Sequence, residues 1–354
     1  MVIKMKIRNR IFSISTFVLL FGFSALLISK PEICKNSIAS SIVLCSGIII
    51  PSLYPFGVCT LYFMKSGFFE RLDFLSPITL KLFGLSTYPF FIFLFSLVGG
   101  YPIGAKLLNE AVNDEILSPE SARKMGRFCV NAGPAFIISA VGSGILGNKK
   151  LGVILFASHF LSSLIICSFF GNITSRNLQN KEVANPVDNF VLSASQTSST
   201  VLSICAFVIL FSVFTGYIEY FANEFGFLKP FIYLVEITTA ITKTRNIYLI
   251  SFLLGFSNLC IWAQILAISR NISIKILDFA IFRILHGLIS AFLTFILLKI
   301  FPVTISTFST TYSFTTKALV SNKTLSISLL VLGVTFIISI SNRQTYGKIL
   351  EEIL

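Results

Sequence analysis

Charged side chains are scarce in this sequence, and their scarcity excludes most soluble folds. Only 12% of the 354 residues are charged, whereas 55% are hydrophobic. A typical soluble domain carries about 25% charged residues. The mean hydropathy is +0.86, and several apolar runs approach the roughly 20 residues that a bilayer-spanning helix needs. The composition therefore predicts an all-α polytopic membrane protein.

Histidine and paired cysteines are also scarce. The chain has two histidines and seven cysteines, and no two cysteines form a C-x-x-C pair. Structural zinc sites need four such ligands at close spacing. Most of the cysteines lie in apolar stretches, where a free thiol behaves as a small hydrophobic group. We therefore expect no metal site, no resident cofactor and no disulfide framework.

Sequence motifs of the common membrane-associated enzymes are missing. There is no GxxxxGK[ST] loop for phosphate binding, no HExxH zinc motif and no GxSxG nucleophile turn. ATP hydrolysis, zinc proteolysis and lipase chemistry each depend on one of these groups. We therefore expect that the protein is not an enzyme.

Positive charge is in excess, with a formal net charge of +13. The basic residues lie mostly at the ends of apolar runs, as the positive-inside rule predicts for cytoplasmic loops. Nucleic acid is not an expected partner, because no basic patch is interleaved with aromatic residues. The lipid bilayer is the expected environment.

The N-terminal segment 1–37 is predicted to form a transmembrane helix. Four basic residues precede the apolar run 11–28, which favours a cytoplasmic N-terminus in the cell membrane. A cleaved signal peptide is the alternative, but the run is long and no A-x-A site follows it.

The remaining chain divides into two halves of similar organisation. A polar stretch at 173–195 is interpreted as a linker between a first repeat at 38–172 and a second repeat at 196–302. The segment 303–354 is predicted to hold a C-terminal transmembrane helix and a short tail.

Each half contains an apolar segment that a continuous helix does not favour. The first reads GGYPIGAK at 99–106, with glycine and proline at its centre. The second, VEITTAITK at 235–243, is short and contains a glutamate and three threonines. Broken apolar segments of this kind are typical of re-entrant hairpins.

Further paired features indicate an internal duplication. A second polar break follows in each half, at 131–134 and at 255–258, and the helix interiors 48–56 and 206–214 also correspond. Each half then closes with a histidine in a similar helix, His159 and His286. Two independent core histidines are the alternative explanation.

Paired broken segments in two halves point to the binding site of a transporter. Unwound backbone leaves N–H and C=O groups that lipid cannot satisfy, whereas a polar substrate in a protein-lined cavity can. Helix N-termini favour anionic groups. The expected partner is therefore a small-molecule anion.

Several long motifs resemble the bacterial sporulation integral membrane proteins. The motifs, in the order in which that family carries them, are GGYPIGAKLLNEAVNDEILSPESARKMGRFCVNAGPAFIISAVGSGILGN, LGVILFASHFLSSLI, LVEITTAIT, FLLGFSNLCIWAQILAIS and RILHGLISAFLT. The resemblance covers roughly residues 38–300. That family carries nucleoside-recognition gate domains and includes a dipicolinate transporter of spore formers.

The resemblance implies a secondary transporter related in fold to concentrative nucleoside transporters, with one moving domain built from two helical hairpins. Dipicolinate would cross the membrane around the developing spore. A second copy of the chain, in a homo-oligomer, is a further candidate partner. The chain departs from the family at Val130, Ala240, Ser257, Asn258 and Trp262. These departures keep three alternatives open, namely nucleosides as substrate, another metabolite, or a non-transporting sporulation scaffold.

The candidate substrate-binding residues all lie at or beside the four breaks. They are Gly100, Tyr101, Pro102, Gly104, Lys106, Asn131, Gly133, Pro134, Glu236, Thr238, Thr239, Ser257, Asn258 and Gln264.

Glu236 is the strongest single candidate, because a carboxylate within a membrane segment is costly and usually functional. It is expected to couple transport to H⁺ or Na⁺. The alternatives are an interfacial location or an ion pair with Lys243, Lys106 or Arg283. A separate local ion pair is expected between Arg283 and Asp278, which lie about one helical turn apart.

Other candidates have two interpretations each. Asn131 and Gln264 are suited to binding a substrate and equally to cross-linking helices. Lys106 would pair with a dicarboxylate or remain solvated on an interfacial helix. The two histidines are expected to be structural, because their helices are rich in small residues that favour close packing.

Overall fold

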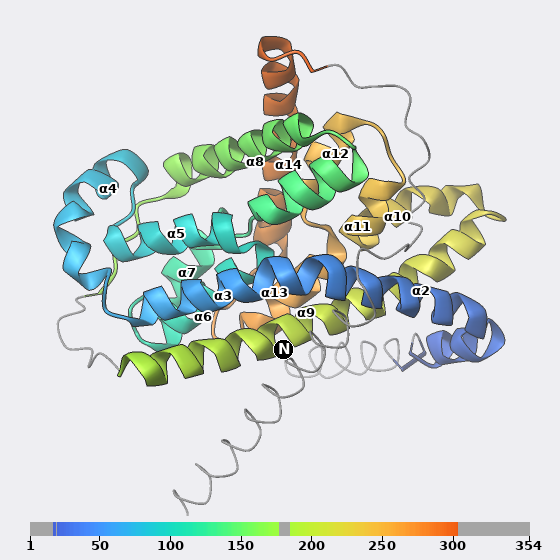
Figure 1. Ribbon diagram of the computed structural model, residues 1–354, viewed down its shortest axis with the longest axis horizontal. Helices are drawn as coiled ribbons and strands as arrows, with labels where there is room; N and C mark the ends of the chain where they lie inside the picture. The colour runs from blue at the N-terminus through green and yellow to red at the C-terminus, as the bar shows by residue number, and fades with distance from the viewer. Residues whose placement is uncertain (1–16, 19, 177–184, 304–354) are drawn as a thin grey trace, which may run out of the picture.

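A computed structural model shows a protein built from helices joined by loops (Figure 1). It describes residues 17–18, 20–176 and 185–303. The predicted C-terminal helix lies outside these ranges, and so do residues 1–16 of the predicted N-terminal segment. A helix at Leu20–Ser29 belongs to the described part.

The helices that follow are given in chain order. They are α2 (Pro31–Leu44), the π-helix η1 (Cys45–Ile49), α3 (Ile50–Lys65), the 3₁₀-helix η2 (Glu70–Leu75), α4 (Ser76–Phe83), α5 (Thr87–Gly99), α6 (Tyr101–Asn113), α7 (Pro119–Met125), the π-helix η3 (Ala135–Ile145), α8 (Lys149–Phe170), α9 (Pro186–Ala222), the 3₁₀-helix η4 (Gly226–Leu228), α10 (Lys229–Val235), α11 (Ile237–Thr242), α12 (Ile247–Phe256), α13 (Asn258–Ile268) and α14 (Ile276–Ile300).

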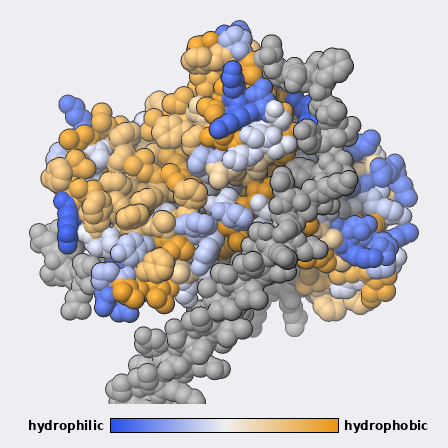
Figure 2. All heavy atoms as spheres, viewed as in Figure 1, coloured by the Kyte–Doolittle hydropathy of each residue, from blue (hydrophilic) through white to orange (hydrophobic). Residues whose placement is uncertain are grey.

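Five helical stretches in the described part are long and apolar enough to cross a bilayer. They are Pro31–Lys65, Lys149–Phe170, Pro186–Ala222, Ile247–Ile268 and Ile276–Ile300. Large hydrophobic side chains such as Phe74, Leu277 and Phe292 are well exposed on the outer surface, and Figure 2 shows broad apolar areas on one face. Lipid is the solvent that accommodates so large an exposed apolar surface.

Helix starts follow local capping signals in the sequence. The Ser118 hydroxyl accepts a hydrogen bond from the Ser121 amide at 3.1 Å, and Pro119 opens α7 as expected. Asn185 caps α9 in the same way, and Pro186 is its first residue. An asparagine cap followed by proline thus starts α9 at Pro186, inside the stretch 173–195 that is interpreted as a linker.

The first broken segment is a helical hairpin. α5 and α6 have 13 residues each, so each is about 20 Å long and shorter than the roughly 30 Å hydrocarbon core. Gly100 between them has a φ of +87°, a conformation that glycine adopts readily. The two helices pack against each other, which is the geometry of a re-entrant hairpin. Most residues of α6 are buried within the protein.

The other three breaks also interrupt helices. Glu236 is extended and separates α10 from α11. Ser257 and Asn258 have positive φ angles of 67° and 41° between α12 and α13. Residues 130–133 form an irregular stretch before Pro134 and the π-helix η3. The backbone thus changes direction at each place where the sequence predicts it.

Two groups of helices surround these breaks. α9 packs along α2 and α3, and in Figure 1 α3 and α9 run side by side across the lower part of the view. The two histidine helices, α8 and α14, pack against each other, and α12 packs on α14. The α10–α11 hairpin contacts α9 and α12, one helix from each group. The α5–α6 hairpin packs on α3 and reaches α12 through the hydrogen bond from Tyr101 to Leu254.

Candidate functional site

One pocket receives the broken ends of both halves of the chain. Its cavity volume is about 70 Å³, below the roughly 300–1,000 Å³ that is usual for small-molecule sites, so the pocket is narrow in this structure. Its lining residues are Ile49, Ser52, Leu53, Gly100, Tyr101, Pro102, Gly133, Phe136, Ile204, Val208, Glu236, Ile237, Thr238, Cys260, Ile261 and Gln264.

The structure divides the predicted site residues into two groups. Those that line the pocket are Gly100, Tyr101, Pro102, Gly133, Glu236, Thr238 and Gln264. Those that lie outside its lining are Gly104, Lys106, Asn131, Pro134, Thr239, Ser257 and Asn258. Whether any of them binds a substrate stays a prediction.

Gly100 and Gly133 bring two breaks of the first half into backbone contact. A Cβ atom at Gly133 would lie 2.9 Å from the Val98 carbonyl oxygen and 3.3 Å from the Gly100 nitrogen. The start of α6 and the start of η3 therefore lie side by side at the pocket wall. Helix N-termini carry partial positive charge, so this wall is electropositive without any cationic side chain.

Glu236 forms the opposite wall and caps the short helix α11. Its two carboxylate oxygens accept hydrogen bonds from the amides of Thr238 and Thr239 at 2.9 and 2.7 Å. The side chain is only 3% exposed. Thr239 thus contributes through its backbone, behind the lining. The interfacial alternative for Glu236 does not match this burial.

The alternative of an ion pair at Glu236 is not what the structure shows, because the three candidate cations bind other groups. Lys243 lies 3.2 Å from Glu219, and Lys106 lies 2.8 Å from Glu110. Among the lining residues that the structure describes, Glu236 is the one charged group. No group of three or more His, Cys, Asp or Glu in the described ranges is arranged to hold a metal ion.

Side chains tie the breaks to one another across the two halves. The Tyr101 hydroxyl donates to the Leu254 carbonyl at 2.6 Å, near the end of α12. The Asn258 amide donates to the Tyr233 carbonyl on α10. Carbonyl groups near the helix breaks are thus satisfied by protein side chains.

Asn131 and Gln264 have different surroundings. The Asn131 amide donates to the Ser96 hydroxyl at 3.0 Å and to the Phe128 carbonyl at 2.7 Å. It is fully buried and cross-links helices. Gln264 lines the pocket, and its amide nitrogen has the Cys260 sulfur at 3.3 Å. Sulfur is a weak acceptor, so Gln264 remains suited to a ligand.

Arg283 is a fully buried cation that the sequence assigned to the wrong partner. Its guanidinium donates to the carbonyls of Val130 and Arg127 at the first-half break. Asp278 instead accepts two hydrogen bonds from Arg127, at 3.1 and 2.9 Å. The tertiary fold places the exposed carbonyls of the loop after α7 beside α14, and these replace the local carboxylate.

Glycine and proline shape the first-half break. A Cβ atom at Gly104 would lie 1.9 Å from the Cys129 carbonyl oxygen, so only glycine lets α6 approach this loop. Pro134 directly precedes η3. Both residues position the pocket wall from behind it.

Sequence reasoning missed the pocket wall contributed by α3 and α9. Ser52 and Leu53 come from α3, Ile49 from η1, and Ile204 and Val208 from α9. Most of them fall in the matched interiors 48–56 and 206–214, which was the available signal. The π-helix that ends at Ile49 has no sequence signature, although π-bulges are frequent at functional sites.

A search of known proteins finds a relative among sporulation proteins. The chain is 24% identical over 328 residues to the sporulation integral membrane protein YlbJ of Bacillus subtilis (strain 168), covering 78% of this chain and 80% of that protein. No protein-family model matches the sequence, and no solved structure matches it. The apolar helices and the similarity to an integral membrane protein together support a multi-pass membrane protein.

Proposed function

We propose that this protein is a secondary transporter of a small organic anion, with dipicolinate during spore formation as the first candidate. One observation carries the proposal: a single pocket is lined by the break at Gly100, the break at Gly133 and the break at Glu236. A scaffold has no need for interrupted helices from both halves around one cavity. The relative's role in sporulation supports the setting.

The electropositive wall favours an anion. α6 begins at the pocket, and its positive dipole end would face an anion there. Pro102 has no N–H and the Ile103 amide donates to the Gly100 carbonyl at 3.1 Å, so the Tyr101 amide is the donor that this helix start offers. The adjoining Gly133 backbone adds a second helix start at the same place. A substrate carboxylate beside Gly100 and Tyr101 would receive these hydrogen bonds.

The opposite wall requires a coupling cation. A carboxylate substrate would share the pocket with the Glu236 carboxylate, and two like charges repel strongly in a medium of low dielectric constant. A proton on Glu236, or a Na⁺ beside it, removes this repulsion. We assign the coupling role to Glu236, and with it H⁺ or Na⁺ as the coupling ion.

The arrangement of the halves suits a moving domain. The α5–α6 and α10–α11 hairpins both point broken ends at the pocket, and the histidine helices α8 and α14 pack together behind them. We propose that these elements form two related repeats, as in concentrative nucleoside transporters, and move against the α3–α9 pair. The site is proposed to lie in the membrane around the developing spore.

A neutral ring compound such as a nucleoside is the second candidate. The lining is mostly apolar, with the aromatic rings of Tyr101 and Phe136, and no lysine or arginine is among its described residues. Such a wall suits a flat, uncharged ring. Competition by nucleosides against labelled dipicolinate separates the two candidates.

The test is uptake by the full-length protein reconstituted in lipid vesicles. We expect labelled dipicolinate to accumulate when a proton or Na⁺ gradient is imposed. Glu236→Gln should lower this uptake at least tenfold, whereas Glu224→Gln, an exposed glutamate after α9, should leave it unchanged. Absence of uptake of either compound class by the wild-type protein would overturn the transport proposal. Normal uptake by Glu236→Gln would remove the coupling assignment alone.

A further inference from the structure

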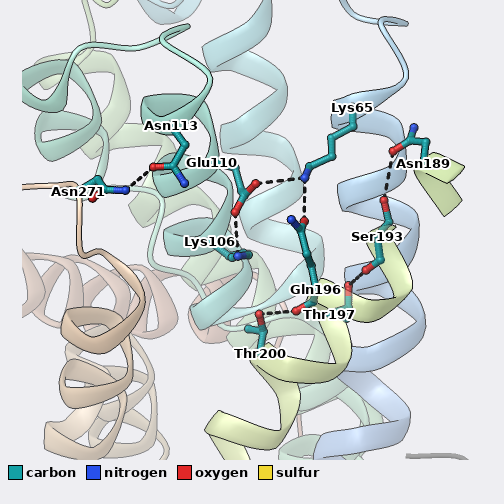
Figure 3. A network of polar contacts seen from close by, with 10 residues as sticks. All are labelled: Lys65, Lys106, Glu110, Asn113, Asn189, Ser193, Gln196, Thr197, Thr200 and Asn271. Atoms are coloured by element: carbon teal, nitrogen blue, oxygen red, sulfur yellow. Dashed lines mark hydrogen bonds and ion pairs between the residues drawn. The ribbon is translucent and has the colours of Figure 1, made fainter. Parts of the chain in front are cut away.

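A charged network lies beyond the pocket, where α3, α6 and α9 meet (Figure 3). The Glu110 carboxylate binds Lys106 at 2.8 Å and Lys65 at 3.1 Å. Lys65 also donates to the Gln196 side-chain oxygen at 2.8 Å. The three charged side chains are only 15–18% exposed. Two lysines share one glutamate, so the network has one positive charge in excess.

A polar stripe on α9 runs from its start to this network. The stripe consists of Asn189, Ser193, Gln196, Thr197 and Thr200, and all but Gln196 are buried. Their spacing of three or four residues places them on one helix face. Ser193 donates to Asn189, and Thr200 donates to the Gln196 carbonyl at 2.9 Å. Polar groups on a buried face of a membrane helix are costly and usually functional.

The stripe points toward the pocket along the same helices. Ile204 lines the pocket and follows Gln196 by eight residues on α9, about 12 Å along the helix axis. On α3, Leu53 lines the pocket and precedes Lys65 by twelve residues, about 18 Å. The network and the pocket are therefore two sites along one interface between α3, α6 and α9, which we call the seam.

The seam is closed between the charged network and the pocket. A Cβ atom at Gly57 of α3 would lie 2.6 Å from the Thr197 methyl carbon and 3.1 Å from the Ile103 Cδ1 atom. Three helices thus touch at one point with no space for a solute. Gly57 on one side, with Thr197 and Ile103 on the other, closes the seam in this state.

We propose that this seam is the second half of the substrate path and that Lys65, Lys106 and Glu110 form an anion-binding station within it. The ligand class is a small carboxylate. It replaces Glu110 as the partner of one lysine, so ion pairs are exchanged rather than lost. The excess positive charge draws the carboxylate along the polar stripe once the contact at Gly57 opens. This inference rests on the proposed transport function.

A labelling experiment tests the station without requiring transport. Thr200→Cys is introduced into the full-length protein, and the new thiol is alkylated in membranes with two small thiol reagents, one an anionic sulfonate and one a cationic trimethylammonium. Labelling of the parent protein is subtracted to remove the native cysteines. We expect the anionic reagent to react at least tenfold faster.

Neutralising the lysines should abolish that preference. In Lys65→Gln and Lys106→Gln backgrounds the ratio of the two rates should fall toward one. Lys243→Gln, which removes a cation paired with Glu219 far from the seam, should leave the ratio unchanged. Equal rates in the starting protein, or no labelling from either side, would overturn the station.

Uptake measurements separate this inference from the transport proposal. With an active protein, Lys65→Gln should raise KM for dipicolinate at least fivefold, and Lys65→Arg should restore most of the affinity. An unchanged KM in Lys65→Gln would overturn the station while transport stands. A protein that transports nothing but still shows the labelling preference would remove the transport proposal and support the station as an anion site.

Discussion

The imidazole rings of His159 and His286 stack with their centroids 4.5 Å apart. One comes from α8 and the other from α14, and both are fully buried. The His159 Nε2 atom accepts the Ala132 amide at 3.0 Å, and the His286 Nε2 atom lies 3.3 Å from the His159 carbonyl oxygen. The stack therefore joins the two halves and holds the break at 130–134.

Replacement of His159 should destabilise the protein through this break. His159→Leu leaves the buried Ala132 amide without an acceptor, which costs about 1–3 kcal/mol. His286→Phe keeps an aromatic ring in the stack and loses one weaker hydrogen bond, so it should cost less. Chemical unfolding in detergent measures both. Equal losses for the two variants would contradict the role given to Ala132.

Arg283 should not be replaceable by lysine. Its guanidinium reaches the carbonyls of Val130 and Arg127 at once, and a lysine ammonium on a flexible stem lacks this planar fork. Arg283→Lys should lower the free energy of unfolding by about 2 kcal/mol, because one buried carbonyl loses its donor. Lys299→Arg, at the end of α14, is the matched control, for which no change is expected. A neutral result for Arg283→Lys would show that the fork is dispensable.

Gly104 should not tolerate even one added methyl group. The Cβ atom of Gly104→Ala would meet the Cys129 carbonyl oxygen at 1.9 Å, and overpacking of this kind costs about 1–3 kcal/mol or more. Gly47→Ala is the control, because nothing lies within 4 Å of its Cβ position. Comparison of folded yield and midpoint of thermal unfolding checks the pair. Similar behaviour of both variants would argue against the close approach of α6 and the loop.

Tyr101→Phe should weaken the tie between the first and the last break. It removes the hydrogen bond from the Tyr101 hydroxyl to the Leu254 carbonyl, with an expected loss of about 1 kcal/mol in stability. The exposed Tyr248 on α12 supplies the control Tyr248→Phe, which should be neutral. Accessibility of the pocket, measured by alkylation of the native Cys260, should rise in Tyr101→Phe alone. Unchanged alkylation would show that the tie does not hold the pocket closed.

Backbone breaks were predictable because glycine, proline and capping residues act locally. Gly100 takes a positive φ that side chains disfavour, and Glu236 caps the helix that follows it. Both effects depend on a few neighbouring residues. The positions of the breaks were therefore visible without a fold.

Partners across the chain were not predictable in the same way. Lys106 was expected to meet a dicarboxylate or solvent, and it forms a local pair with Glu110 on α6, which Lys65 of the distant helix α3 joins. Arg283 was expected to bind Asp278, and it binds carbonyls from a loop about 150 positions earlier. Such choices depend on which segments the fold brings together, and sequence spacing does not contain that information.

The sequence by itself determined the membrane class and the places where helices are interrupted, because hydrophobicity and backbone freedom are properties of short stretches. Tertiary structure alone decided which interruptions face a common pocket, that α3 and α9 complete its wall, and that Lys65 joins Lys106 around Glu110. Burial makes most buried polar groups find a partner, but packing of distant helices decides which partner is within reach.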